Sequence, residues 1–341
     1  MPESSLFILL FIIALAVGFG VANGFNDAAN AIATVIGTRS LSPRTAILMA
    51  AFFNLLGAAS GTAVAMTIGK GILTPEIVGE YSYAPIVAAL ASIIVWATVA
   101  TYLGLPVSIS HGFVAGLAAA GLALAGTEAV LWGWGFKLTT TLMAVITAPL
   151  LGFFGGFILM VALYWIFRHT APDKVHSISS YLQILASAFL AYSHGKNDGQ
   201  MPIGVITMAL VIYTGQSDMW DAIPWWVIVV SALAISFGTA TGGWRVIRTL
   251  GMKMTNLRPV HGFAAQTAGS VVIEIASHFG IPVSTTHCVS SSIMGVGATR
   301  RLSAVRWGVA GNIVIAWVLT FPICAGLGYL FAWILKTALY S

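Results

Sequence analysis

Two stretches of the chain, Gly104-Leu-Pro-Val-Ser-Ile-Ser-His111 and Gly280-Ile-Pro-Val-Ser-Thr-Thr-His287, carry nearly the same motif, at a shift of 176 positions between the two histidines. A second pair, Gly24-Phe-Asn-Asp27 and Gly195-Lys-Asn-Asp198, repeats at a shift of 171 positions between the final aspartates. The two shifts agree within five residues, and repetition at a fixed spacing is the mark of an internal repeat. The motifs therefore predict that one ancestral unit has been duplicated.

Both copies lie in a strongly apolar chain. Of its 341 residues 58% are hydrophobic and 7% charged, with a mean hydropathy of +0.94, whereas soluble domains carry about 25% charged residues. The apolar runs are close to the ~20 residues that a helix needs to cross a bilayer, and they lack the alternation of a transmembrane β-barrel. We therefore predict an all-α integral membrane protein with ten spans, over residues 4–38, 44–69, 84–104, 106–126, 137–167, 180–213, 222–244, 261–279, 282–299 and 306–337.

A polar interruption in the middle of the chain marks the boundary between the copies. Residues 169–179 form this interruption, so we expect a first membrane repeat over 1–168 and a second over 180–341, joined by a linker loop. The first apolar run follows Met1-Pro-Glu3 without a basic region, and it is predicted to be a span and not a cleaved signal peptide.

Loop charges predict how the two repeats are oriented. The loop with Arg39 and Arg44 in the first half corresponds to a loop with Asp218 and Asp221 in the second, and the other loops also alternate in sign. Because basic loops stay on the cytoplasmic side, this pattern predicts an inverted repeat of five plus five spans with both termini outside. We expect the location to be a bacterial inner membrane.

The net charge and the cysteine content disfavour several classes of protein. The net charge of +5 comes mostly from short loops, where membrane topology explains it, so no nucleic-acid partner is expected. The two cysteines, Cys288 and Cys324, lie in apolar surroundings and imply neither a disulfide framework nor a cysteine metal cluster.

Residues 106–126 and 282–299 are short and rich in Gly and Ser, so they can form either spans or re-entrant hairpins.

The repeated Asn-Asp pairs, Asn26-Asp27 and Asn197-Asp198, are candidates for a coupling-cation site. A charge inside an apolar span costs at least ~2.5 kcal/mol and therefore needs a partner or a function. Gly, Asn and Asp are poor in helix interiors, so both copies predict broken helices. Freed carbonyls with a carboxylate and an amide oxygen suit Na⁺, and a carboxylate can equally carry a proton.

The repeated Pro-Val-Ser motif predicts the other half of a site. Proline favours the start of a helix, and hydroxyls in the first turn lie beside free backbone N–H groups at the positive end of the dipole. Two such starts near the middle of the membrane would bind a small tetrahedral oxyanion. The candidate substrate residues are Ser108, Ser110, Ser284, Thr285 and Thr286, with Asn26 and Asn197.

Four further polar residues are secondary candidates. His111 and His287 can donate to an anion, carry protons or cap a buried network. Lys196 can neutralise Asp198 or face the substrate, and we favour the structural pairing. Glu274 lies in an otherwise apolar stretch and is either a coupling residue or a buried hydrogen-bonded acid.

Three stretches resemble the inorganic phosphate transporter (PiT) family. They are GFNDAANAIATVIGTR from Gly24, HGKNDGQMPIGVITMAL from His194 and RPVHGFAAQTAGSVVIEIASHFGIPVSTTH from Arg258. The resemblance covers nearly the whole chain. It implies inverted repeats, uptake of orthophosphate coupled to Na⁺ or H⁺, a homodimer, and in some bacterial members phosphate carried as a neutral divalent metal complex.

Matched position by position, the resemblance implies that Asn26, Asp27, Asn197 and Asp198 hold coupling cations and that the serines and threonines of the Pro-Val-Ser motifs surround phosphate. The fullest family motif has a further asparagine, which is Asn30 in the first copy. The second copy has Met201 there, preceded by Gln200, so it departs from a symmetric pair of Na⁺ sites.

The sequence therefore predicts a secondary transporter that imports phosphate by symport with H⁺ or Na⁺ through alternating access, with no cofactor. Another tetrahedral oxyanion such as sulfate, or a metal-phosphate complex, is the alternative cargo. A channel would need no coupling carboxylates. An intramembrane hydrolase using Ser110 or Ser284 with a histidine is disfavoured, because adjacent Ser110 and His111 point about 100° apart on a helix.

Overall fold

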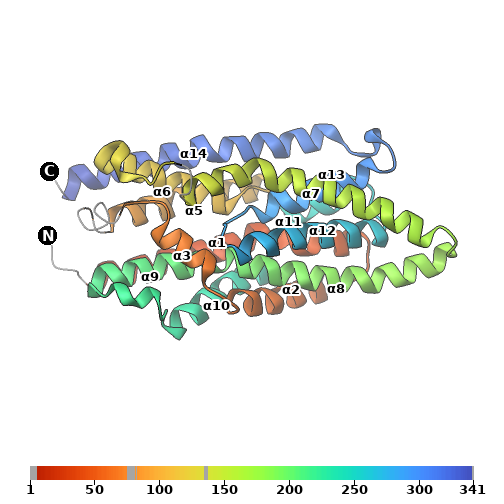
Figure 1. Ribbon diagram of the computed structural model, residues 1–341, viewed down its shortest axis with the longest axis horizontal. Coiled ribbons are helices and arrows are strands. Elements are labelled where there is room, and N and C mark those ends of the chain that lie inside the picture. Colours follow the sequence, from red (N-terminus) through yellow and green to blue (C-terminus); the bar gives the residue numbers. More distant parts are fainter. Residues whose placement is uncertain (1–5, 75–80, 82, 134–136, 340–341) are drawn as a thin grey trace.

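The computed structural model describes residues 6–74, 81, 83–133 and 137–339, and helices dominate this part of the chain. Its only β contact there is an isolated bridge between Leu73 and Val130. In chain order the main helices are α1 (Leu6–Gly37), α2 (Pro43–Ala58), α3 (Ala63–Lys70), α5 (Ala84–Leu103), α6 (Ile109–Ala125), α7 (Lys137–Phe167), α8 (Pro172–Asp198), α9 (Gln200–Thr214), α10 (Trp225–Thr241), α11 (Trp244–Arg248), α12 (Pro259–His278), α13 (Thr285–Ala298) and α14 (Trp307–Leu339). They lie roughly along one long axis (Figure 1).

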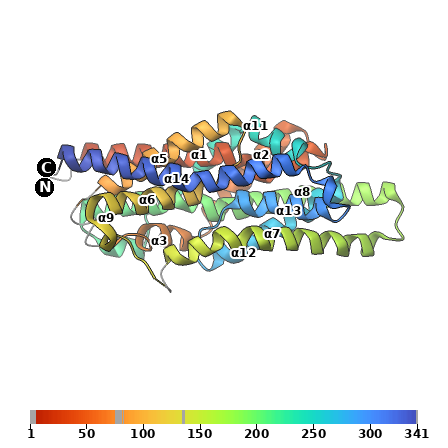
Figure 2. The ribbon, with the colours of Figure 1, turned by 90° about the horizontal axis from the view of Figure 1, so that it is seen from above.

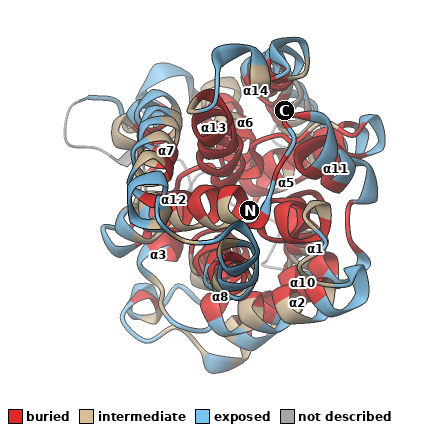
Figure 3. Ribbon diagram, turned by 90° about the vertical axis from the view of Figure 1, so that its right-hand side faces the viewer, coloured by how far each residue is buried: buried red, intermediate tan, exposed pale blue. Residues whose placement is uncertain are grey.

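The surface of this bundle is that of a membrane protein. Large apolar side chains are exposed along the outer helices, for example Phe7, Phe52, Ile146, Phe237 and Val318. Seen end-on, buried residues gather in the middle and exposed ones form the rim (Figure 3). Soluble monomers rarely expose apolar area on this scale, so the rim is the lipid-facing surface. The prediction of an all-α integral membrane protein is confirmed.

The number of helices suited to cross a membrane is smaller than the ten predicted spans. Five described helices are long and apolar enough, and two bent pairs raise the number to seven. Predicted spans at 180–213 and 261–279 fall on α8 with α9 and on α12. Both α8 and α12 carry buried polar side chains, such as Gln183 and Gln266, which lower their hydropathy.

The helix breaks lie elsewhere than predicted. The expected break at Gly24–Asp27 is wrong, because α1 continues without interruption from Leu6 to Gly37. The second copy lies at a helix end: α8 stops at Asp198, and α9 follows after Gly199. Sharp bends occur instead between α2 and α3, at 68°, and between α10 and the segment Trp244–Lys253, at 61°.

Helices α6 and α13 begin inside the protein, close to one another. The ring centroids of His111 and His287, in their first turns, are 5.1 Å apart. The end of α6 is tied to the C-terminal helix, because Lys336 Nζ donates to the carbonyl of Leu124, whereas Arg300 beyond α13 lies beside the α7–α8 turn. The two helices therefore run toward opposite ends of the molecule (Figure 1).

The predicted helix starts at Pro106 and Pro282 are corrected by a few residues. Helix α6 begins at Ile109 with Ser108 as its N-cap, and α13 begins at Thr285 with Ser284 as its N-cap. Each serine hydroxyl accepts the backbone N–H three residues later, which satisfies a donor that the first helical turn leaves free. The two prolines lie before these caps, in the non-helical segments that lead into α6 and α13.

Packing between helices is matched in the two halves of the chain. Helix α1 packs on α10 as α8 packs on α2, and α6 packs on α14 as α13 packs on α7. Figure 2 shows α14 lying along the bundle, with α7 and α8 extending together beyond it. Both Asn-Asp helices cross their partners at glycine: a Cβ on Gly24 would lie 2.1 Å from the carbonyl oxygen of Ile235, and one on Gly195 would lie 2.1 Å from that of Asn54. These crossings therefore require the absence of a side chain.

We predict that Gly195→Val lowers the thermal stability of the purified protein by several degrees. Its side chain would collide with the backbone of α2, and overpacking of this kind costs about 1–3 kcal/mol. Gly311→Val is the matched control, because no atom lies within 4 Å of a Cβ at that position. Thermal unfolding followed by tryptophan fluorescence in detergent measures the difference. Equal transitions for the two variants would contradict the close crossing.

Candidate functional site

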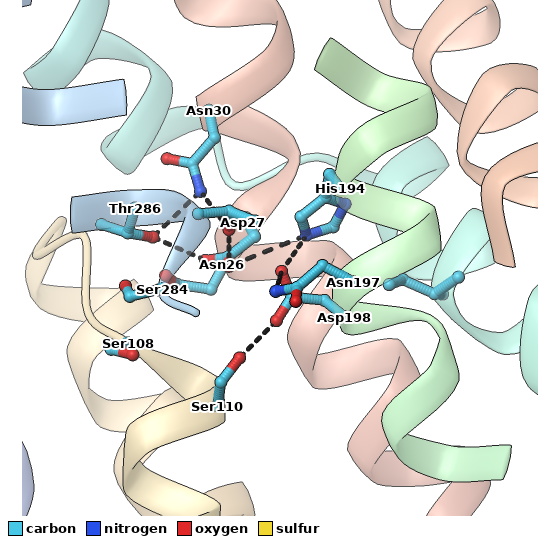
Figure 4. Close-up of polar contacts among 12 residues, drawn as sticks. Asn26, Asp27, Asn30, Ser108, Ser110, His194, Asn197, Asp198, Ser284 and Thr286 are labelled. Atoms are coloured by element: carbon cyan, nitrogen blue, oxygen red, sulfur yellow. Dashed lines mark hydrogen bonds and ion pairs between the residues drawn. The ribbon is translucent and has the colours of Figure 1, made fainter. Parts of the chain in front are cut away.

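Two buried carboxylates and one imidazole form the polar centre of the molecule. Asp27 from α1 and Asp198 from the end of α8 are each at most 2% exposed. His194, one turn before Asp198, places Nε2 3.7 Å from Oδ2 of Asp27 and 3.5 Å from Oδ2 of Asp198 (Figure 4). One ligand atom from each residue lies within 4.8 Å of the others. This is a set of groups that a cation can bridge.

Each carboxylate also accepts hydroxyl hydrogen bonds from a helix start in the opposite half. Thr285 and Thr286, at the start of α13, donate to Oδ2 and Oδ1 of Asp27 over 3.1 and 3.2 Å. Ser110, at the start of α6, donates to Oδ1 of Asp198. The contacts are crossed, since the first-half aspartate contacts the second-half helix and the reverse. The structure thus brings both predicted motifs together at one point.

Asn30, the additional amide of the first motif, supports this arrangement. Its Nδ2 donates to the hydroxyl oxygens of Thr285 and Thr286 over 3.2 and 2.9 Å. A threonine hydroxyl that accepts from Asn30 directs its own hydrogen toward Asp27. The position predicted from the resemblance therefore orients the two hydroxyls, and the amide lies in the same cluster (Figure 4).

The asparagines of the two Asn-Asp pairs contact the turns before the helix starts. Asn26 donates to the carbonyl of Leu105 and accepts from the N–H of Val107, both over 3.4 Å. Asn197 does the same with one residue, Val283, donating over 2.7 Å and accepting over 3.4 Å. Each asparagine thus holds the turn of its own half. Their amides therefore position the helix starts, and the carboxylates are not the only groups that they contact.

A chain of hydrogen bonds fixes the orientation of His194. The hydroxyl of Thr239 donates to the carbonyl of Ile235, so its oxygen accepts from Nδ2 of Asn54. The Asn54 Oδ1 then faces Nδ1 of His194 at 2.6 Å and can only accept, so Nδ1 carries the proton. The remaining nitrogen, Nε2, is left to face both carboxylates. A proton or a metal cation bound there offsets their charge.

The predicted histidines and serines lie next to the cluster, but the histidines pack on aromatic rings and the serines cap helices. The imidazole of His111 stacks on Phe321 with centroids 5.6 Å apart, and that of His287 lies 4.1 Å from the Trp317 ring. The hydroxyls of Ser108 and Ser284 cap α6 and α13. In Figure 4 no dashed line joins either serine to Asp27 or Asp198.

Three further candidates make structural contacts away from the carboxylates. Lys196 forms an ion pair with Glu274, on α12, and not with Asp198. Gln200 accepts the backbone N–H of Val64 over 2.9 Å, at the start of α3. Lys196 and Glu274 are partly exposed, and Gln200 is buried. The expected pairing of Lys196 with Asp198 is therefore wrong, because its carboxylate partner is Glu274.

His194 and Asn54 were missed as site residues. His194 precedes Asp198 by four residues, and this spacing places both side chains on one face of a helix. That signal could have identified it. Asn54 shows no comparable pattern, because its part depends on the packing of α2 against α8.

Comparison with known proteins places the chain in a family. Residues 23–328 match the family model described as "Phosphate transporter family". The chain belongs to this phosphate transporter family. A protein of Rhizobium meliloti, described as "Probable low-affinity inorganic phosphate transporter", is 41% identical over 93% of each chain. A Bacillus subtilis protein with the same description is 40% identical over 97% of this chain and 98% of its own.

A solved structure supports the same assignment for the transporter. It is described as "The sodium-dependent phosphate transporter" and matches with a TM-score of 0.89 at 28% identity, over 98% of this chain and 100% of the other. The resemblance to the PiT family is thereby confirmed, and so is the prediction that the chain is a transporter and not an enzyme. Ser110, the candidate nucleophile of the disfavoured hydrolase, instead donates its hydroxyl to Asp198.

We predict that Asn26→Ala and Asn197→Ala each destabilise the transporter and reduce its transport. Either change leaves buried backbone groups of a turn without their partner, which costs about 1–3 kcal/mol. Asn312→Ala, at an exposed position on α14, is the matched control. Thermal unfolding and uptake by reconstituted protein measure both effects. Variants as stable and active as the control would show that the amides do not hold the turns.

Proposed function

We propose that this transporter imports inorganic phosphate by symport with a cation. The proposal rests on one observation: the aspartate of each half contacts the hydroxyls at the helix start of the other half. A cation site and an anion site built this way share the same side chains. The substrates named for its relatives, inorganic phosphate above all, support the choice of cargo.

Charge provides the coupling in this proposal. Without a cation, Asp27 and Asp198 repel an approaching phosphate and their oxygens hold the hydroxyls of Thr285, Thr286 and Ser110. A cation at the carboxylates offsets the repulsion, and the hydroxyls then donate to phosphate oxygens beside the helix N-termini. Each ligand raises the affinity for the other by the same factor, as thermodynamic linkage requires.

The coupling cation is Na⁺ or a proton. Sodium is favoured by the description of the related solved structure as sodium-dependent. A proton is favoured by Nε2 of His194, which faces both carboxylates and is a titratable group. Cargo in the form of a metal-phosphate complex remains the alternative that the same carboxylates would accept.

Alternating access in an inverted repeat is the conformational part of the proposal. Support comes from α6 and α13, which begin together and run to opposite ends, and from the matched packing of the two halves. The two repeats over 1–168 and 180–341 would rock about the carboxylate cluster. Both termini would lie outside, with the α7–α8 turn inside.

Uptake of radiolabelled phosphate into proteoliposomes tests the function. We predict that Asp27→Asn and Asp198→Asn each reduce cation-driven uptake at least roughly tenfold, since removing a coupling charge removes ~1.4 kcal/mol or more of coupling. Na⁺ and H⁺ gradients are imposed separately, with excess sulfate as competitor. Asp218→Asn, at an exposed loop, is the matched control. Normal uptake by both site variants would refute the proposed site, and uptake abolished by sulfate would indicate a different cargo.

Cysteine labelling tests the orientation. The native cysteines are buried, so we predict that Ser217→Cys reacts with a membrane-impermeant maleimide in right-side-out vesicles. His169→Cys, at the α7–α8 turn, should react only after the membrane is opened. Both positions are exposed, so accessibility differs only through the bilayer. The reverse labelling pattern would place the termini inside.

A further inference from the structure

A large pocket lies far from the carboxylate cluster, at the α7–α8 turn. Its volume is about 670 Å³, and it is bounded by the end of α7, the start of α8 and the start of α12. Thr38, just beyond α1, and Arg300, beyond α13, complete its wall. The pocket therefore joins the linker between the two halves to parts of both.

Basic side chains dominate the polar part of this pocket. Arg168, Arg258 and Arg300 line it, with Asp173 as the acidic lining residue. Among the residues that the structure describes, no carboxylate lies within ion-pairing distance of these three guanidinium groups. Arg168 lies over the Trp165 ring at 5.3 Å, and Arg300 reaches only a backbone carbonyl, that of Asn256, at 3.5 Å. Three unpaired positive charges around one cavity favour an anion.

The N-termini of two helices add to the positive charge around the pocket. Helices α8 and α12 both begin at the pocket, with Pro172 and Pro259 in their first turns. Each long helix contributes about half a positive charge at its N-terminus. Arginine forks match the oxygen geometry of a phosphate group, which they bind bidentately.

The rest of the lining leaves room for a ligand larger than a bare anion. Leu163, Phe167 and Val260 form an apolar wall beside the arginines. Pockets of this volume hold organic ligands with an apolar body and a few polar groups. A phosphate group at the arginines with an attached apolar portion would fill both parts.

We propose that this pocket, which we call the linker pocket, binds the phosphate group of an anionic ligand through Arg168, Arg258 and Arg300. The ligand is either an anionic phospholipid headgroup at the membrane surface or free phosphate. Basic pockets between membrane helices on the cytoplasmic side bind acidic lipid headgroups, and the positive loop charges predict that the linker pocket lies on that side. The site is separate from the carboxylate cluster and does not depend on the transport proposal.

Native mass spectrometry of the purified full-length protein tests the lipid source. The probe is dioctanoyl phosphatidylglycerol, and the variant is Arg258→Gln with Arg300→Gln. We expect the double variant to bind the probe at least roughly tenfold more weakly, because two charge-assisted contacts are lost. Arg301→Gln is the matched control: it is exposed, adjacent to Arg300 and outside the pocket lining. The single variant Arg168→Gln provides a second test should the double variant not fold.

Radiolabelled inorganic phosphate tests the other source. It is measured by equilibrium binding to the wild type, the pocket variants and the Arg301→Gln control, so that any phosphate held at the unchanged central cluster is common to all three and cancels in the comparison. Binding that is removed by Arg258→Gln with Arg300→Gln, and kept by Arg301→Gln, identifies free phosphate as the ligand. If the pocket variants lose phosphatidylglycerol binding but phosphate binding does not change, the ligand is the lipid. The proposal is overturned when neither probe binds, or when binding of both is the same in the pocket variants and the Arg301→Gln control.

Discussion

Burial of two carboxylates at one point inside an apolar bundle is the constraint on which the rest of the structure depends. A charged group in a membrane interior must be paired or hydrogen-bonded, because hydrocarbon offers no compensation. Asp27 and Asp198 obtain that compensation from His194 and from hydroxyls of the opposite half. Separation of the halves would take His194 and the threonine hydroxyls from Asp27, and the Ser110 hydroxyl from Asp198. The contacts that place the cluster therefore also hold the two halves of the chain together.

Other features of the interior follow from this constraint. The helix starts of α6 and α13 must lie within reach of the carboxylates, and the amides of Asn26 and Asn197 fix the turns that precede them. Close crossing of α8 over α2, which Gly195 permits, brings Asn54 to His194. Backbone packing thus determines the orientation of an imidazole. A larger residue at such a crossing changes the electrostatics of the site as well as the packing.

The sequence predicted the helical membrane fold, the paired motifs and most of the cluster, because duplicated polar residues in an apolar chain are visible without a structure. The sequence predictions failed where contacts between residues distant in the chain override local helix propensity. Gly24 to Asp27 predict a break on propensity alone, yet α1 continues because Asn26 bonds Thr101, 75 residues away, and Asp27 bonds Thr286, 259 residues away. The prolines predicted helix starts too early, since the cap is set by a serine hydroxyl.

The two copies differ at the cluster, and the differences determine its charge. At the shift of 171 residues that relates Asp27 to Asp198, Asn23 takes the position of His194. Asn23 is fully buried, and its amide has no hydrogen-bond partner among the described residues, whereas His194 contacts both carboxylates. A strictly symmetric duplication would provide two imidazoles for two carboxylates. This chain has one imidazole that faces both carboxylates, so the side chains of the two halves form a single polar centre.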